Sequence, residues 1–291
     1  MTAVQIRDVG PRDGLQGERP LESARRVELI ARLVEAGLRD IEVASFVSPK
    51  AVPAMAGAGD VVAASRDFAG DDVTLWALVP NVKGAELAKA AGVDHLTITI
   101  SASPAYSEKN VHMTIDEAKA QVEAIRAAAP GAVLDEVISC CFGSPFDGEA
   151  ITPDDVDAIV EHARGAGIDL VTLADTTGMA TPRRISSVLG VVGSDVGLHL
   201  HDTRGTALVN AWFAIEHGIR RFDTALGGLG GSPFAPTAGG NLATEDLVFV
   251  LDDVGLETGI DLDRLLDAGS LLADLVGHAL PSRVAAAGGI R

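Results

Sequence analysis

The segment Val4–Gly14, which reads VQIRDVGPRDG, decides between two fold classes. It opens with an apolar, strand-like run, Val4–Val9, and this strand ends in Gly10-Pro11-Arg12-Asp13-Gly14. An open, doubly wound α/β sheet usually places a Gly-rich, phosphate-binding turn after its first strand. The strand end found here is no such turn, so the sequence favours a closed barrel if enough strands follow.

Strand and helix signals alternate outward from this segment along the chain. Further strand-like runs lie at Asp40–Ala44, Val73–Val79, His95–Ile100, Val133–Ser139, Leu170–Ala174, Val196–Leu200 and Arg221–Ala225. Helical patterns lie at Ser23–Ala36, Val82–Ala91, Thr114–Ala128, Pro153–Ala166, Pro182–Val192 and Ala207–His217. This alternation predicts an α/β fold, a (βα)8 TIM barrel, with catalytic groups at the C-terminal ends of the strands. Because the region after Leu242 continues as helix, we expect one domain over residues 1–291.

Charge and composition exclude several classes of protein. The formal net charge of −18 argues against nucleic-acid binding, which needs clustered Lys and Arg. It also means that an anionic substrate must be held by local cations, because the overall field repels it. No apolar run reaches the roughly 18 residues of a membrane span, and Met1 leads into a strand without a targeting leader. Cys140 and Cys141 are adjacent and so rarely bridge, which fits a reducing compartment. We therefore expect a cytoplasmic protein that binds neither nucleic acid nor membrane.

Two histidines at the end of the seventh strand-like run indicate a metal site. In Leu198-His199-Leu200-His201-Asp202, alternation along a strand puts both imidazoles on one face. Asp13, at the end of the first strand, can add a carboxylate from the same end of the barrel. Mixed nitrogen and oxygen ligands suit Mg²⁺ or Mn²⁺ better than a thiolate-rich zinc site does. The alternatives are a hydrogen-bonded histidine pair under a loop and an Arg12-Asp13 surface pair.

Further polar and glycine-rich segments follow other strands. Glu42 lies among apolar residues, where an unpaired carboxylate is costly, so Arg12 is its natural partner. That pair is either structural or aims the Arg12 guanidinium at a developing anion. Asp175 either orients a histidine or a metal-bound water, or caps the next turn. The glycines of Gly227–Gly231 and Gly239–Asn241 predict either a mobile loop over the barrel mouth or a simple connector.

Four segments together resemble the 3-hydroxy-3-methylglutaryl-CoA lyase family, a metal-dependent branch of the DRE-TIM barrel superfamily. They follow one another with family-like spacing, at Gly10–Gln16, Ser45–Lys50, His199–Thr203 and Gly240–Asp246. The resemblance implies a carbon–carbon lyase of the oxo-acid-lyase type, with a place in leucine degradation. The implied reaction is divalent-metal-dependent, retro-Claisen cleavage of 3-hydroxy-3-methylglutaryl-CoA to acetyl-CoA and acetoacetate.

The resemblance also implies roles for single residues. Arg12, held by Glu42, stabilises an enolate, and His199 accepts the proton of the substrate hydroxyl. The divalent ion, Mg²⁺ or Mn²⁺, is implied to bind Asp13, His199, His201 and Asn241. The acyl-CoA substrate is expected to contact the loop Ser103–Asn110, through Lys109 and Asn110. We also expect a homo-oligomer, a dimer.

One position departs from the family pattern. The lyases place a Cys implicated in protonating the product after Gly-Leu-Gly-Gly, and this chain has Ser232 there. A hydroxyl is a much weaker acid than a thiol of pKa about 8.5, so Ser232 is a candidate acid either directly or through a loop water. Three alternatives stay open: a lyase for a related 3-hydroxyacyl-CoA such as citramalyl-CoA, a condensing enzyme of the same superfamily, and a non-catalytic acyl-CoA-binding paralogue.

Overall fold

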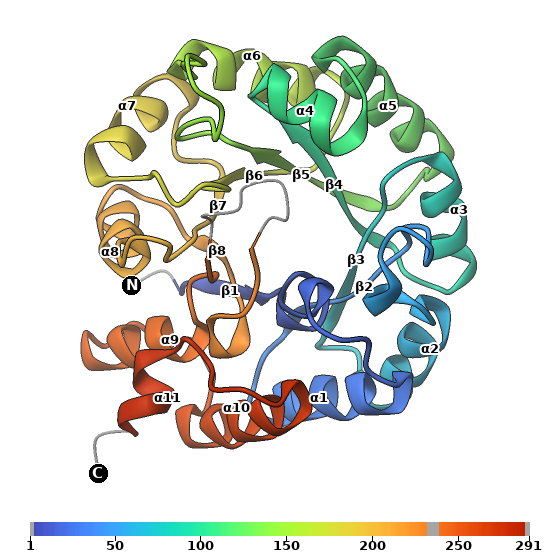
Figure 1. The fold of residues 1–291 in the computed structure, drawn as a ribbon, viewed down its shortest axis with the longest axis vertical. Coiled ribbons are helices and arrows are strands. Elements are labelled where there is room, and N and C mark those ends of the chain that lie inside the picture. Colours follow the sequence, from blue (N-terminus) through green and yellow to red (C-terminus); the bar gives the residue numbers. More distant parts are fainter. Residues whose placement is uncertain (1–2, 232–238, 289–291) are drawn as a thin grey trace.

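The computed structural model describes residues 3–231 and 239–288 of the chain. Parallel strands close into an eight-stranded barrel, because β1 pairs with both β2 and β8 (Figure 1). The strands are β1 (Gln5–Asp8), β2 (Asp40–Ser45), β3 (Thr74–Leu78), β4 (His95–Ser101), β5 (Val133–Ser139), β6 (Leu170–Ala174), β7 (Gly197–His199) and β8 (Arg221–Thr224). The predicted (βα)8 barrel is confirmed, and a single domain over residues 1–291 stays a prediction.

Helices form a ring around the barrel, in which α10 packs beside α1, and α9 packs against α8, α10 and α11 (Figure 1). Their bounds are α1 (Ser23–Glu35), α2 (Ala58–Ala69), α3 (Val82–Ala90), α4 (Pro104–Val111), α5 (Ile115–Ala128), α6 (Pro153–Gly165), α7 (Pro182–Val192), α8 (Ala207–Glu216), α9 (Thr244–Asp253), α10 (Leu262–Val276) and α11 (Arg283–Ala287). No helix among the described residues is both long and apolar enough to cross a membrane.

Helix α4 corrects one expectation, because most of the segment Ser103–Asn110 is helix rather than loop. The Ser103 side chain accepts a hydrogen bond from the Tyr106 N–H and so caps the helix. Pro104 occupies the first turn, where a missing N–H costs nothing. The Ser-Pro pair thus marks the start of a helix, although the segment has no apolar periodicity that would predict one.

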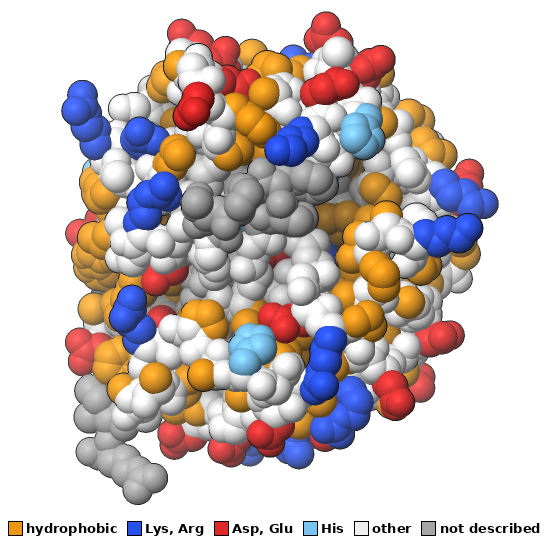
Figure 2. Space-filling model, viewed as in Figure 1, with side chains coloured by type: hydrophobic (Ala, Val, Ile, Leu, Met, Phe, Trp, Pro, Cys, Tyr) orange, Lys and Arg blue, Asp and Glu red, His pale blue; other side chains and the backbone are white. Residues whose placement is uncertain are grey.

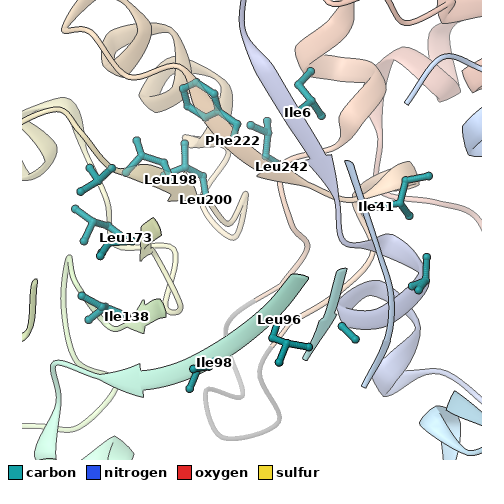
Figure 3. Packing of buried hydrophobic residues seen from close by; sticks show 14 of the residues in the cluster. Ile6, Ile41, Leu96, Ile98, Ile138, Leu173, Leu198, Leu200, Phe222 and Leu242 are labelled. Atoms are coloured by element: carbon teal, nitrogen blue, oxygen red, sulfur yellow. The ribbon is translucent and has the colours of Figure 1, made fainter. Parts of the chain in front are cut away.

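The apolar core lies between the strands and the helices. Figure 3 shows Ile6, Ile41, Ile138 and Leu198 on their strands, with side chains directed away from the barrel centre. All four are buried, and α1 packs against this layer with its own buried apolar stripe, Leu29, Ile30 and Leu33. Such a stripe at helical spacing is what attaches a surface helix to a sheet.

The intervening side chains of the same strands point into the barrel, as alternation requires. Several of these are buried and charged: Arg7, Glu42, Asp135, His199 and Asp223. They are paired, for example through an Arg7 Nη2 to Asp135 Oδ2 distance of 2.8 Å. The interior is therefore polar, and its groups near the C-terminal strand ends are available to a site there.

Candidate active site

The first strand ends in a π-helical turn, Gly10–Gly14, that presents two neighbouring charged side chains. The backbone N–H groups of Arg12, Asp13 and Gly14 all bond to the carbonyl oxygen of Val9, at 3.1, 2.7 and 3.2 Å. This tight turn places Arg12 Nη1 2.8 Å from Asp13 Oδ1. Single π-helical turns are frequent at functional sites because they redirect side chains in this way.

The predicted contact between Arg12 and Glu42 is present. Arg12 Nε donates to Glu42 Oε2, and the Glu42 side chain is fully buried. Arg12 thus uses Nε for Glu42 and Nη1 for Asp13, so two buried carboxylates hold its guanidinium plane.

Three of the four predicted metal ligands converge at the same barrel end. One ligand atom from each of Asp13, His199 and His201 lies within 4.8 Å of the other two, and all three residues are buried. The two imidazoles meet edge to face, with ring centroids 5.2 Å apart. His201 lies beyond the end of β7 and forms an isolated backbone bridge with Asn241, which brings the fourth predicted ligand to the same place.

Hydrogen bonds define which nitrogen of each histidine can act. His201 Nδ1 lies 3.0 Å from the carbonyl oxygen of Thr176, which can only accept, so Nδ1 carries the proton. His201 Nε2 then holds the lone pair, and it is buried without a hydrogen-bond partner in the described structure. His199 Nδ1 lies 3.2 Å from Asp223 Oδ2. Arg7 and His199 hold the pKa of Asp223 well below its usual range against the effect of burial, so Asp223 also accepts and the His199 lone pair is on Nε2.

Asn241 reaches Asp13 from the other end of the chain. Its Nδ2 donates to Asp13 Oδ2 at 2.7 Å and to the Leu229 carbonyl at 2.8 Å. Its Oδ1 is buried and has no partner within the described ranges. A Cβ on Gly230, where φ is +123°, would meet Asn241 Nδ2 at 2.2 Å and Asp13 Oδ2 at 2.9 Å. A glycine is therefore required for the loop backbone to approach this pair.

The buried atoms left without partners fit a divalent cation. Asn241 Oδ1 and His201 Nε2 are unpaired acceptors, which cost free energy when buried unless a donor or a cation satisfies them. Asp13 adds a charged oxygen, and this set of two nitrogens and two oxygens suits a hard or borderline divalent ion.

The protonation states favour the same interpretation. Burial opposes ionisation of Asp13, but Arg12 and His199 outweigh it and lower the pKa of this carboxyl. Burial and then His199 lower the pKa of His201 to about 4, so its imidazole is neutral near pH 7. Burial acts in the same direction on His199, but the hydrogen bond and charge of Asp223 outweigh it and raise the pKa of His199.

Two roles predicted for His199 use the same atom. Because Nδ1 donates to Asp223, the neutral ring has one lone pair, on Nε2. Ligating a cation and accepting a substrate proton are therefore alternatives at any moment for this residue.

The Asp175 side chain makes no hydrogen bond to a histidine within the described ranges, and its role toward a histidine or a metal-bound water stays a prediction. Its Oδ1 accepts from the Ala180 N–H at 2.9 Å, as a turn cap does, and burial raises its pKa to about 7. Its Oδ2 has no hydrogen-bond partner among the described atoms. The carboxylate that contacts His199 is Asp223, whose Oδ2 lies 3.2 Å from His199 Nδ1. Strand alternation directs Asp223 into the barrel but does not by itself choose it over Asp175.

Other predicted residues lie at various distances from this cluster. Lys109 is in the last turn of α4, with Nζ 5.3 Å from the centroid of the Phe146 ring, and Asn110 follows it. Cys140 is fully buried at the end of β5, and burial raises the pKa of its thiol to about 12. Ser232 lies outside the described residues.

Gln16 was not predicted, yet its Nε2 donates to Asp13 Oδ1 at 2.9 Å and helps to fix that carboxylate.

A family model described as HMGL-like matches residues 3–272. The chain belongs to the HMGL-like family. It is 43% identical to the (R)-citramalyl-CoA lyase of Chloroflexus aurantiacus over 99% of this chain and 96% of that one. It is also 39% identical to the mitochondrial hydroxymethylglutaryl-CoA lyase of Homo sapiens, over 98% and 89% of the two chains.

Solved structures of the HMGL-like family share the fold closely. An HMG-CoA lyase from Acinetobacter baumannii, in complex with coenzyme A and 3-methylmalate, superposes with a TM-score of 0.93 at 40% identity, covering 99% of this chain and 97% of that one. These relatives confirm the predicted family and the predicted enzyme class, a carbon–carbon lyase.

Proposed function

We propose that the protein is a divalent-metal-dependent lyase that cleaves 3-hydroxy-3-methylglutaryl-CoA to acetyl-CoA and acetoacetate. The observation that carries this proposal is the convergence of Asp13, His199, His201 and Asn241 beside the Arg12–Glu42 pair. Relatives named as hydroxymethylglutaryl-CoA lyases, 38 to 40% identical over nearly the whole chain, support the choice of substrate.

Asp13, His199, His201 and Asn241 would hold the cation, Mg²⁺ or Mn²⁺. A divalent cation at this place supplies a Lewis acid that polarises substrate oxygens and attracts a carboxylate to an acidic protein. Figure 2 shows Lys and Arg side chains interspersed with Asp and Glu around this face, so a cation held at its centre would supply the positive charge that a substrate carboxylate needs.

The protein groups around the cation have separate tasks in the cleavage. His199, whose Nδ1 is held by Asp223, would accept the proton of the substrate's C3 hydroxyl at Nε2. The oxygen's electron pair then forms the ketone, the C2–C3 bond breaks, and its electrons form the thioester enolate. Arg12, whose Nε and Nη1 are bound to carboxylates, donates to the enolate oxygen through Nη2. Ser232, or a water that it holds, then delivers a proton to C2.

The coenzyme A part of the substrate is proposed to pass near α4. Lys109 and Asn110 are its proposed contacts, and the complex of the Acinetobacter baumannii relative with coenzyme A supports an acyl-CoA ligand. Lys109 already covers the Phe146 ring, so its ammonium is placed beside an apolar surface.

A second candidate substrate, (R)-citramalyl-CoA, is favoured by the 43% identical relative from Chloroflexus aurantiacus. It shares the tertiary 3-hydroxyl group and differs by one methylene before the terminal carboxylate, so the same chemistry would release pyruvate in place of acetoacetate. One methylene is worth only about 1–3 kcal/mol of discrimination, so both substrates can turn over at different rates.

A steady-state assay with both thioesters tests the proposal. We expect kcat/KM to be higher for the hydroxymethylglutaryl thioester, with acetoacetate and acetyl-CoA formed in equal amounts. A higher kcat/KM for citramalyl-CoA, with pyruvate as product, would transfer the assignment to the second candidate. Net synthesis from acetyl-CoA would indicate a condensing enzyme, and binding without turnover would indicate a non-catalytic paralogue.

A further inference from the structure

His199 and two buried polar residues behind it, Asp223 and Arg7, stand in register on three neighbouring strands. Arg7 of β1 pairs with Asp223 of β8 in the strand register, and Asp223 pairs in turn with His199 of β7. Their exposed fractions are only 6, 6 and 8%. Asp223 contacts His199 at Nδ1, and Arg7 in turn contacts Asp223, so the Nε2 of His199 is not used by either residue.

Arg7 restricts what residue 223 can be. Its Nε donates to Asp223 Oδ1 at 2.8 Å and its Nη2 to Asp223 Oδ2 at 3.0 Å. A guanidinium has donors only, so this forked contact requires an acceptor at both positions. Asp223 Oδ2 also faces His199 Nδ1 at 3.2 Å and therefore accepts from it.

Arg7 is itself held from a second direction. Its Nη2 lies 2.8 Å from Asp135 Oδ2, and both oxygens of Asp135 also accept from the Thr172 hydroxyl, at 3.0 and 2.9 Å. The Arg7 guanidinium carbon lies 4.7 Å from the centroid of the Trp76 ring. Arg7 therefore has little freedom to turn away from Asp223.

We infer that Arg7 and Asp223 are positioning residues for the reaction, which act through the tautomer of His199. Arg7 makes residue 223 an obligate double acceptor, and this acceptor keeps the His199 proton on Nδ1. The lone pair on Nε2 then faces Asp13 and His201. The inference rests on the proposed function, because either use of His199, as ligand or as base, needs that lone pair.

Asp223→Asn is the informative substitution, because an amide has the shape of the carboxylate but a single acceptor. With Arg7 present, the amide oxygen takes the Oδ1 place beside Arg7 Nε, which has no other acceptor among the described residues, whereas Arg7 Nη2 keeps Asp135. The NH2 group then takes the Oδ2 place and faces His199. The His199 proton then moves to Nε2, and this nitrogen can no longer bind a cation. With Arg7→Met added, the amide is free to turn its oxygen to His199 and restore the original tautomer.

Mn²⁺ affinity, followed by electron paramagnetic resonance titration, measures the effect without any substrate. We expect Asp223→Asn to weaken Mn²⁺ binding about 10- to 100-fold, the scale for loss of an outer-shell partner. The double variant Asp223→Asn/Arg7→Met should regain most of that loss. Glu136→Gln is the matched control: it is an isosteric change of a fully buried carboxyl of β5 whose oxygens have no hydrogen-bond partner among the described residues, and it should alter Mn²⁺ affinity less than about threefold.

The tautomer itself is read by ¹⁵N–¹H correlation spectra of the metal-free protein with ¹⁵N-labelled histidine. The wild type should show the His199 proton on Nδ1, Asp223→Asn should show it on Nε2, and the double variant should show it on Nδ1 again. Thermal unfolding of each metal-free variant separates this effect from general destabilisation. General destabilisation would make the double variant less stable than either single variant and would lower its Mn²⁺ affinity further.

Two results would overturn the inference. One is an unchanged tautomer in Asp223→Asn, and the other is a double variant that binds Mn²⁺ no better than Asp223→Asn. If the wild type bound no Mn²⁺ at all, the proposed function would fail instead, and the spectra of the metal-free variants would still decide the inference.

Discussion

Asn241 Nδ2 donates a hydrogen bond of 2.7 Å to Asp13 Oδ2, although 228 positions separate the two residues in the chain. The contact joins the turn after β1 to the loop after β8, which are neighbours only because the barrel closes. It also sets the amide of Asn241 so that Nδ2 is used and Oδ1 is left for a cation. The proposed metal site therefore depends on how closely the backbone at Gly230 approaches Asp13 and Asn241.

Gly230→Ala tests that dependence. The added Cβ would lie 2.2 Å from Asn241 Nδ2, on a backbone with φ of +123°, so we expect Asn241 to be displaced and Mn²⁺ affinity to fall at least about tenfold. Gly239→Ala is the control within the same loop, because a Cβ there meets nothing within 4 Å. Calorimetric titration that found equal affinities for both variants would contradict this account of the loop.

Arg12→Gln should reduce kcat about a hundredfold or more, with a smaller change in KM. The reason is that its proposed partner, the enolate oxygen, carries charge only as the C2–C3 bond breaks. Arg32→Gln, an exposed arginine of α1, is the control and should behave as the wild type. Steady-state kinetics that showed a rise in KM alone would make Arg12 an anchor for a substrate carboxylate or phosphate.

The barrel and the convergence of its strand-end residues could be predicted from the sequence. Alternating strand and helix patterns implied a closed parallel sheet, and a closed parallel sheet brings every strand's C-terminal end to one rim. Asp13, Glu42 and His199 were therefore expected to lie close together at this rim. Asn241 was predicted only through family resemblance, because no periodic pattern fixes a loop residue. The expected dimer and cytoplasmic location stay predictions.

The partner of His199 could not be predicted in the same way. Asp175 directly follows β6 and Asp223 lies on β8, on either side of β7, so spacing along the chain allows either one to hold the histidine. The choice depends on which carboxylate is already fixed by other groups. Arg7 fixes Asp223 through a tertiary contact, whereas the local Ala180 N–H makes Asp175 the cap of a turn.

Glu136 of β5 should make stability depend on pH. It is fully buried, and neither carboxyl oxygen has a hydrogen-bond partner in the part of the chain that is described. Burial, and then the charge of Asp135, raise its pKa from 4.5 to about 8. The folded state thus holds this proton more tightly than the unfolded state does. The stability that this provides is complete below about pH 4.5 and is lost as the pH rises to about 8.

Glu136→Gln removes that ionisation while keeping the shape. We expect the free energy of unfolding of the variant, relative to that of the wild type, to increase as the pH rises from about 5 to about 8. The increase should be up to a few kcal/mol, since one pKa unit is about 1.4 kcal/mol. Glu123→Gln, at an exposed glutamate of α5, is the control. Urea unfolding at both pH values checks this, and an equal effect of Glu136→Gln at each would show that Glu136 does not ionise in this range.

Ser232 is tested by two substitutions on one set of substrates. If its hydroxyl occupies the place of the acid, Ser232→Cys should raise kcat for hydroxymethylglutaryl-CoA about tenfold, because a thiol is the better proton donor near neutral pH. Ser232→Ala should lower it. A kcat of Ser232→Ala equal to that of the wild type would remove Ser232 from the reaction and leave a loop water as donor, since the Cys140 thiol, with its pKa raised to about 12 by burial, is a poor one.

The central claim, cleavage through an enolate at a divalent-metal site, is tested most directly by the isotope content of the product. Metal-depleted protein is incubated with 3-hydroxy-3-methylglutaryl-CoA in D₂O, with and without added Mg²⁺ or Mn²⁺, and the thioesters are analysed by mass spectrometry. The account predicts acetyl-CoA with one deuterium in its methyl group, formed with an equal amount of acetoacetate, and only when the cation is present. Equal turnover in rigorously metal-free protein, or free CoA released by hydrolysis without acetoacetate, would contradict it.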